Sequence, residues 1–211
     1  MKVDEAYEIW SHSYDQDRNL TRDLDEQFTS TTLKDCRFHS ILELGCGTGK
    51  NTRLFSEIGA NVQAIDFSAA MINQARQKAA FDNVTFTLAD VTQPWPIDDA
   101  SMDLISCNLV LEHVSDLGFV FSEAARVLVT DGLMFVSELH PFRQYQGVQA
   151  RFERDRKPIM IPAFVHHVTD FLESADAAKL SLRALREWWH AEDSGKPPRL
   201  ISFMFRKSGE L

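Results

Sequence analysis

The sequence has few cysteines and no long hydrophobic run. Its 211 residues include three cysteines, Cys36, Cys46 and Cys107, and this odd, widely spaced set indicates neither a disulfide framework nor a zinc site. No stretch reaches the length that spans a membrane, and the first residues lack the apolar core of a signal peptide. We therefore expect reduced thiols and a cytoplasmic protein with no membrane partner.

Positive charge is also scarce. The chain has 22 Lys and Arg against 31 Asp and Glu, which gives a formal net charge of -9. A general nucleic-acid binder needs clustered Lys and Arg to neutralise phosphates, so no nucleic-acid partner is expected. The hydrophobic share of 44% is ordinary for a globular chain, and the length favours one α/β domain over residues 1–211.

The most informative stretch is Ile-Leu-Glu-Leu-Gly-Cys-Gly-Thr-Gly at residues 41–49. It predicts a buried strand that breaks into a glycine turn, with a helix beginning soon after. Glycine allows positive φ and a close approach of ligand to backbone, and a helix N-terminus leaves amides free for polar ligand atoms. A second apolar strand at 62–65 ends in Asp66, which can accept hydrogen bonds from ribose hydroxyls. These features predict a nucleoside-containing cofactor.

The glycine spacing favours one cofactor over another. The dinucleotide fingerprint G-x-G-x-x-G needs a third glycine where Lys50 stands. S-adenosylmethionine carries a sulfonium cation and no phosphate. An acid near the turn, such as Glu43, therefore favours this cofactor over a dinucleotide with its negatively charged pyrophosphate. The run from Glu43 to Gly49 resembles motif I of the class I S-adenosylmethionine-dependent methyltransferases, in their small-molecule, type 11-like branch. A nicotinamide-dependent dehydrogenase remains the alternative.

Strands and helices alternate along the middle of the chain. The patterns predict strands at 41–44, 62–65, 84–88, 102–107 and 133–138, with helices over 50–58, 68–80 and 117–128. Such alternation indicates a parallel sheet with right-handed crossovers and ligands at the carboxyl ends of its strands. With two more strands at 180–188 and 200–205, the resemblance implies a Rossmann-like, seven-stranded, mostly parallel sheet with helices on both faces. In that family strand seven is antiparallel and lies between strands five and six.

The remaining segments surround this core. We divide the single domain into a helical lid at 1–40, a cofactor-binding core at 41–139, an insertion over the site at 140–168, and a C-terminal helix and hairpin at 169–211. Tyr7 and Trp10 in the leader are expected to pack a helix onto the core. Tyr14 with Asp15 resembles the pair with which related lids cover the cofactor.

The resemblance also implies which residues hold S-adenosylmethionine. The product formed from this cofactor would be S-adenosylhomocysteine. Asp66 would bind the ribose, Asp90 the adenine amino group, and the segment after the fourth strand the methionine part. The full set is Tyr14, Glu43, Gly45, Cys46, Gly47, Asp66, Phe67, Met71, Asp90, Val91, Asn108 and Leu109.

Methyl transfer is an in-line displacement that needs a base only when the acceptor has a proton to lose. His113 and His140 follow the fourth and fifth strands and are the candidate catalytic residues. Arg143 and Tyr145 are the candidates to bind the acceptor, and the arginine-rich segment 143–157 suggests that this acceptor is anionic. The alternative for that segment is a solvated surface paired with nearby acids. His166 and His167 could be zinc ligands, but no third or fourth ligand lies at a recognisable spacing from them, so no metal site is predicted.

The sequence therefore predicts methyl transfer to a small-molecule acceptor. An RNA or protein methyltransferase of the same fold and a non-catalytic cofactor-binding module are the alternatives. Amino-methylating nucleic-acid enzymes commonly carry Asn/Asp-Pro-Pro-Tyr after the fourth strand, where this chain reads Asn108-Leu-Val-Leu. The acceptor, the methylated atom and the oligomeric state stay open.

Overall fold

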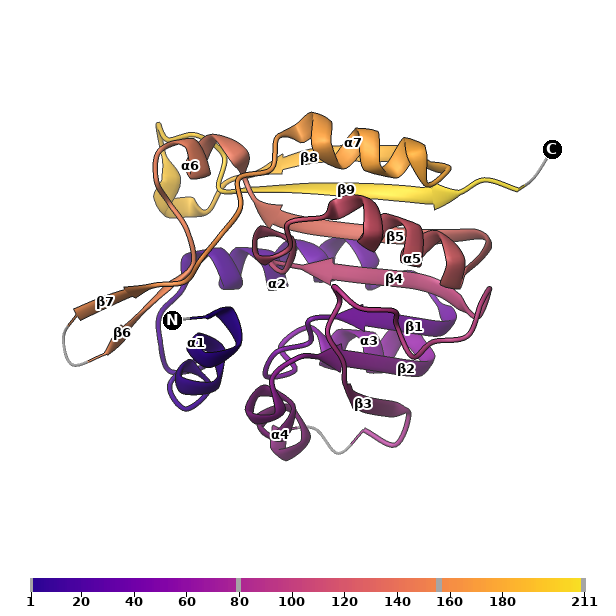
Figure 1. The fold of residues 1–211 in the computed structure, drawn as a ribbon, viewed down its shortest axis with the longest axis horizontal. Coiled ribbons are helices and arrows are strands. Elements are labelled where there is room, and N and C mark those ends of the chain that lie inside the picture. The colour runs from indigo at the N-terminus through magenta and orange to yellow at the C-terminus, as the bar shows by residue number, and fades with distance from the viewer. Residues whose placement is uncertain (1, 79–80, 155–156, 210–211) are drawn as a thin grey trace.

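The chain is built around one seven-stranded sheet with the strand order β3-β2-β1-β4-β5-β9-β8 (Figure 1). The computed structural model describes residues 2–78, 81–154 and 157–209. The strands are β1 (Phe38–Leu44), β2 (Gly59–Asp66), β3 (Val84–Leu88), β4 (Met102–Asn108), β5 (Leu128–Leu139), β8 (Leu180–Trp188) and β9 (Leu200–Lys207). Strands β1 to β5 pair in parallel, and β9 runs antiparallel between β5 and β8. The predicted Rossmann-like sheet with its antiparallel last strand is confirmed.

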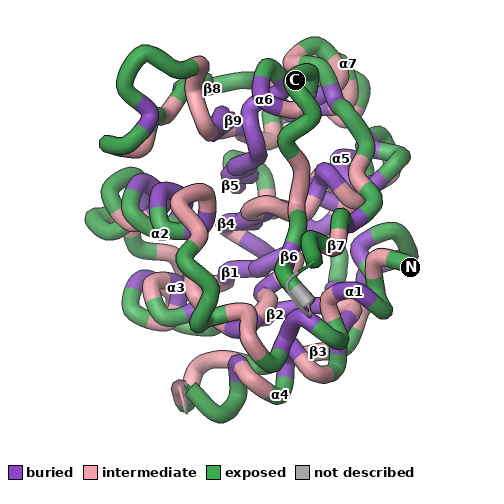
Figure 2. The backbone as a smooth tube through the Cα atoms, turned by 90° about the vertical axis from the view of Figure 1, so that its left-hand side faces the viewer, coloured by how far each residue is buried: buried purple, intermediate pink, exposed green. Residues whose placement is uncertain are grey.

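Helices cover both faces of this sheet. Figure 2 shows α2 (Leu20–Leu33) and α3 (Thr52–Ile58) on one side, with α5 (Leu117–Val127) and α7 (Val168–Ala177) on the other. Helix α1 (Val3–Trp10) packs against α4 (Ala69–Lys78), beside the carboxyl ends of the parallel strands. The predicted end of the helix at 68–80 lies outside the described residues. None of the described helices is long and apolar enough to cross a membrane.

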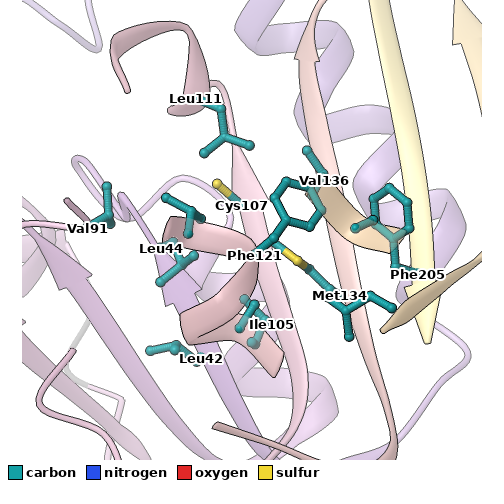
Figure 3. Packing of buried hydrophobic residues seen from close by; sticks show 14 of the residues in the cluster. Leu42, Leu44, Val91, Ile105, Cys107, Leu111, Phe121, Met134, Val136 and Phe205 are labelled. Carbon is teal, nitrogen blue, oxygen red and sulfur yellow. The ribbon is translucent and has the colours of Figure 1, made fainter. Parts of the chain in front are cut away.

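The core on the α5 side is formed by apolar side chains of neighbouring strands. Leu42 of β1, Ile105 of β4 and Met134 of β5 are register partners across three neighbouring strands, and they belong to one buried cluster with Phe121 of α5 (Figure 3). Phe121 meets the edge of Phe205 with ring centroids 5.4 Å apart. Because both faces of the central strands are covered, β1 and β4 are buried at consecutive residues rather than at alternate ones.

The insertion contains structure that the sequence analysis did not predict. It forms the short helix α6 (Pro141–Tyr145) and a hairpin of β6 (Arg151–Arg154) and β7 (Lys157–Met160). Figure 1 shows the hairpin projecting beside α1, at the edge where the parallel strands end. Its short strands lack the alternation that marks a longer strand, which explains why the sequence pattern missed them. Arg156, part of the arginine-rich segment, lies outside the described residues.

The leader is held to the second face of the sheet by aromatic stacking. The ring of Phe28 in α2 stacks on Trp188 of β8 with centroids 4.5 Å apart and planes 6° from parallel. Phe28 also meets the edge of Phe135 at 6.3 Å, and its side chain is almost fully buried. One side chain therefore joins the lid to two strands of the sheet.

Replacing Phe28 by alanine tests that anchoring. We expect Phe28→Ala to lower the free energy of unfolding by about 3–5 kcal/mol, because it removes a buried aromatic ring and leaves a cavity. The half-exposed Phe142 provides the matched control, and Phe142→Ala should change stability by less than about 0.5 kcal/mol. Urea denaturation measures both, and equal losses in the two variants would contradict the anchoring role.

Candidate active site

The glycine turn after β1 places bare backbone beside a cavity. Gly45 and Gly47 have φ values of +65° and +53°, which side-chain-bearing residues rarely adopt. A Cβ atom on Gly45 would come within 2.3 Å of Val110 Cγ2, whereas one on Gly47 would meet no atom within 4 Å. Gly45 is thus required by packing, and Gly47 faces open space that a ligand can use.

Asp66 at the end of β2 joins that turn to the neighbouring strand. Its Oδ2 accepts a hydrogen bond from the Gly47 N–H and its Oδ1 one from the Ser68 N–H, each at 2.8 Å. Burial raises the pKa of Asp66 to about 6, although these two hydrogen bonds favour the ionised form. Each carboxylate oxygen can accept further hydrogen bonds, so Asp66 can still bind hydroxyl groups in the cavity it lines.

The cavity at these strand ends has a volume of about 530 Å³. It brings together ten of the twelve predicted cofactor residues from six different segments: Tyr14, Gly45, Gly47, Asp66, Phe67, Met71, Asp90, Val91, Asn108 and Leu109. Exposed Leu88 and buried Met71 add apolar surface, and Asp90 is exposed with its Oδ1 bonded to the Thr92 N–H at 2.8 Å. An apolar, acid-edged cavity of this size can enclose a nucleoside.

Glu43 and Cys46 lie behind the turn, and neither belongs to the described lining of this cavity. Thr52 donates a hydrogen bond of 2.5 Å to Glu43 Oε2, and burial raises the pKa of Glu43 to about 8. Cys46 packs against Ala64 and Ile72. Glu43 is therefore mainly protonated at neutral pH, so the negative charge that the sequence analysis expected near a sulfonium is not supplied by this residue.

The side chain of Asn108 binds the leader. Its Nδ2 donates to Asp25 Oδ1 at 2.9 Å and to Thr29 Oγ1 at 3.1 Å, both on α2. Asp25 also accepts hydrogen bonds from Ser137 Oγ at 2.6 Å and Asn51 Nδ2 at 2.9 Å. Sequence reasoning missed Asp25, because nothing local distinguishes this buried acid from the exposed acids of the same helix.

Further polar contacts close the leader over the glycine turn. Thr48 Oγ1 donates to Asp15 Oδ1 at 2.8 Å, and Ser68 Oγ donates to Glu8 Oε2 at 3.1 Å. The Arg22 guanidinium lies 3.9 Å from the centre of the Tyr14 ring and donates to the Tyr14 carbonyl. These contacts support the prediction that the leader with Tyr14 and Asp15 is a lid.

His113 lies at the end of the same cavity with both ring nitrogens engaged. Nδ1 is 2.8 Å from the Pro162 carbonyl oxygen, which can only accept, so Nδ1 carries the proton. Nε2 then accepts the hydrogen bond from the Tyr7 hydroxyl at 2.9 Å. Burial lowers the pKa of His113 and raises that of Tyr7, so both are neutral at physiological pH.

The other predicted acceptor-side residues have structural contacts. His140 caps α6 through the Phe142 N–H and bonds to Glu187 Oε1 at 2.9 Å. Arg143 donates to the Pro197 carbonyl at 2.8 Å and pairs with buried Asp193 at 2.9 Å. Tyr145 is 56% exposed and bonds to His167. In the part of the chain that the structure describes, none of these three predicted residues lines the cavities at the strand ends.

A second cavity of about 580 Å³ adjoins the first and shares Tyr7, Tyr14 and Leu109 with it. Leu109 has a φ of +58°, an unfavourable conformation for leucine that turns the chain sharply at the end of β4. The lining of the second cavity includes four arginines and one acid: Arg18, Arg22, Arg151, Arg199 and Glu112. Of these five, the sequence analysis included only Arg151, within its arginine-rich segment 143–157, and it interpreted Tyr7 as packing only.

The comparisons with known proteins agree with this geometry. A family model described as a methyltransferase domain matches residues 42–136. The chain is 32% identical over 134 residues to a malonyl-[acyl-carrier protein] O-methyltransferase of Yersinia pestis, covering 64% of this chain and 49% of that protein. It is 33% identical over 141 residues to a demethylmenaquinone methyltransferase of Tropheryma whipplei (strain Twist), covering 63% and 58%. The chain thus spans about half the length of the curated relatives it matches.

Solved structures share the fold at low sequence identity. The N-methyltransferase NodS of Bradyrhizobium japonicum WM9, in complex with S-adenosyl-L-homocysteine, has a TM-score of 0.74 at 16% identity, covering 99% of this chain and 100% of that one. A putative S-adenosylmethionine-dependent methyltransferase of Listeria monocytogenes has a TM-score of 0.76 at 16% identity, covering 89% and 100%.

The raised pKa of Glu43 predicts a pH-dependent stability. The folded state holds this proton up to about pH 8, whereas the unfolded carboxyl releases it near 4.5. Stability is therefore lost as pH rises through this window, by on the order of 4 kcal/mol for this group. Glu43→Gln, which keeps an oxygen for Thr52, should lose less stability over the window than the wild type does.

Chemical denaturation at several pH values between about 5 and 8 gives the free energy of unfolding of each protein, and the loss with rising pH is compared between the wild type and Glu43→Gln. Glu57→Gln on α3 removes an exposed glutamate and is the matched control. It should follow the wild type. If the free energy of unfolding depends on pH in the same way in the wild type and in Glu43→Gln, then Glu43 ionises normally in the folded protein.

Proposed function

The chain belongs to the class I S-adenosylmethionine-dependent methyltransferase superfamily, and from this premise we propose that it transfers a methyl group from S-adenosylmethionine to a small-molecule acceptor. The observation that carries the proposal is the pair of adjoining cavities at the carboxyl ends of the parallel strands. Both volumes fall in the range of about 300–1,000 Å³ that is usual for small-molecule sites.

The first cavity fits the cofactor. The open space in front of Gly47 admits a ligand against the backbone. Asp66 offers carboxylate oxygens to ribose hydroxyls, Asp90 with Val91 lies where an adenine amino group needs an acceptor, and Phe67 with Met71 provides apolar walls. When bound there, S-adenosylmethionine supplies an activated methyl group on a positively charged sulfur.

The protein's own task is then to align the acceptor and to exclude water. Tyr7, Tyr14 and Leu109 separate the two cavities, so they lie where the methyl group would pass from one to the other. The lid contacts of Asp15 and Glu8 keep the leader closed over this boundary. Leu109, which follows β4 with a φ of +58°, lines both cavities.

The second cavity is the proposed acceptor pocket. Arg22 is almost fully buried there, and its Nε finds no hydrogen-bond partner among the described residues. Arg151 and Arg18 are exposed at the same cavity. An anionic group on the acceptor would be attracted to this wall, a role that the sequence analysis gave to Arg143 and Tyr145. The relatives above are named for malonyl-[acyl-carrier protein] and for demethylmenaquinone, so the names of similar proteins include both a carrier-bound and a free acceptor.

Calorimetric titration with S-adenosylmethionine tests the cofactor site. We expect Asp66→Asn to weaken binding about 10- to 100-fold, because hydrogen bonds to a charged group contribute about 1.5–3 kcal/mol. Asp103→Asn is the matched control, since Asp103 accepts the His39 and Ser40 N–H groups at the opposite edge of the sheet. The control should bind as the wild type does. Wild-type protein that releases no heat, or equal affinity in the wild type and Asp66→Asn, would reject the proposal.

A further inference from the structure

The two histidines predicted to be catalytic residues are not available as general bases. A general base needs a free lone pair within reach of the acceptor proton. His113 uses its only lone-pair nitrogen to accept from Tyr7, and His140 uses its ring nitrogens to cap α6 and to bond Glu187. Any base for the reaction must therefore come from another side chain of the acceptor pocket.

Glu112 has the required free atom. It lies in the one-turn helix η1 (Leu111–His113) directly after β4, it is 6% exposed, and it lines the second cavity. Its Oε1 is 3.9 Å from His113 Nε2. Its Oε2 is buried and has no hydrogen-bond partner among residues 2–78, 81–154 and 157–209. A buried acceptor without a partner costs about 1–3 kcal/mol, so its presence needs an explanation.

We infer that Glu112 is the general base of this site and that the acceptor's nucleophilic atom carries both a lone pair and a proton, as in an alcohol or a phenol. The inference rests on the proposed methyl transfer. As the bond from the nucleophile to the methyl carbon forms, the proton of the nucleophile passes to Glu112 Oε2. The methyl–sulfur bond breaks with its electron pair going to sulfur, which leaves neutral S-adenosylhomocysteine. A carboxylate or thioether acceptor has no such proton and would leave Glu112 without a task.

The electrostatic surroundings of Glu112 suit proton transfer near neutral pH. Burial raises the pKa of Glu112 to about 7, and a base works best when its pKa lies near the operating pH. Tyr7 of α1, His113 of the same turn and Glu138 of β5 lie near it, and four arginines belong to the lining of the same cavity. Protonated Glu138, whose pKa burial raises to about 8, adds little repulsion.

A purely structural role for Glu112 has to be separated from catalysis. Its carboxyl group accepts a backbone hydrogen bond from Ala150 in the insertion, and its own carbonyl accepts one from the Phe164 N–H. Glu112→Gln keeps an acceptor oxygen for Ala150 and the shape of the side chain but cannot take up a proton. This variant therefore isolates the basic function from the anchoring one.

The experiment compares two probe acceptors by release of S-adenosylhomocysteine. 1,4-Dihydroxynaphthalene carries a proton on each oxygen, and iodide is a nucleophile with none. In the wild type, kcat for the naphthalene probe should rise with pH and level off above about 7. Glu112→Gln should lower this kcat about 100-fold or more with little change in KM and abolish the rise with pH, whereas transfer to iodide should change less than about threefold.

Glu138→Gln is the matched control, because it replaces the carboxyl group of a second buried glutamate that is not part of the described lining of either cavity. It should keep the rise with pH. Calorimetric titration of the wild type and of every variant with S-adenosylmethionine separates the two proposals. If the wild type does not bind S-adenosylmethionine, the methyltransferase function itself is refuted. With binding intact, an unchanged Glu112→Gln, an equal loss with both probes, or a wild type that methylates neither probe would overturn the role of Glu112.

Discussion

The common direction of β1, β2, β4 and β5 is the constraint on which the site depends. Because these strands are parallel, their carboxyl ends meet at one edge, and whatever follows each strand must share that space. Gly45, Asp66 and Asn108 come from different strands and reach one cavity for this reason. The hydrogen bond from Gly47 to Asp66 then fixes the glycine turn against the neighbouring strand.

The leader, residues 1–40, adds further contacts to the ends of the strands. Asp25 on α2 receives hydrogen bonds from three side chains that belong to the ends of β4 and β5 and to the start of α3. Burial raises the pKa of Asp25, and these three hydrogen bonds oppose that rise. A buried polar group is tolerated when its partners are satisfied, and here the partners set the position of the lid. Tyr7 and Tyr14 of the leader line both cavities, so the leader forms part of the wall of each.

The sequence predicted the sheet well, and most of the residues it proposed for the cofactor lie together at one cavity, because local patterns determine the positions of both. Gly45, Gly47 and Asp66 follow from a strand, a turn and a second strand at fixed spacing. The acceptor side was not predictable in this way. The Tyr7–His113 contact joins residues 106 positions apart, and it depends on how the leader folds back over the sheet. Arg143, predicted to bind the acceptor, is instead paired with Asp193, which no local pattern connects to it.

A crystal structure with S-adenosylhomocysteine tests the central claim most directly. The account predicts ribose hydroxyls within hydrogen-bond distance of Asp66, the adenine beside Asp90 and Val91, and the sulfur near Leu109, facing the second cavity. A nucleoside bound away from Asp66, or a sulfur directed away from the cavity that contains Glu112, would contradict it.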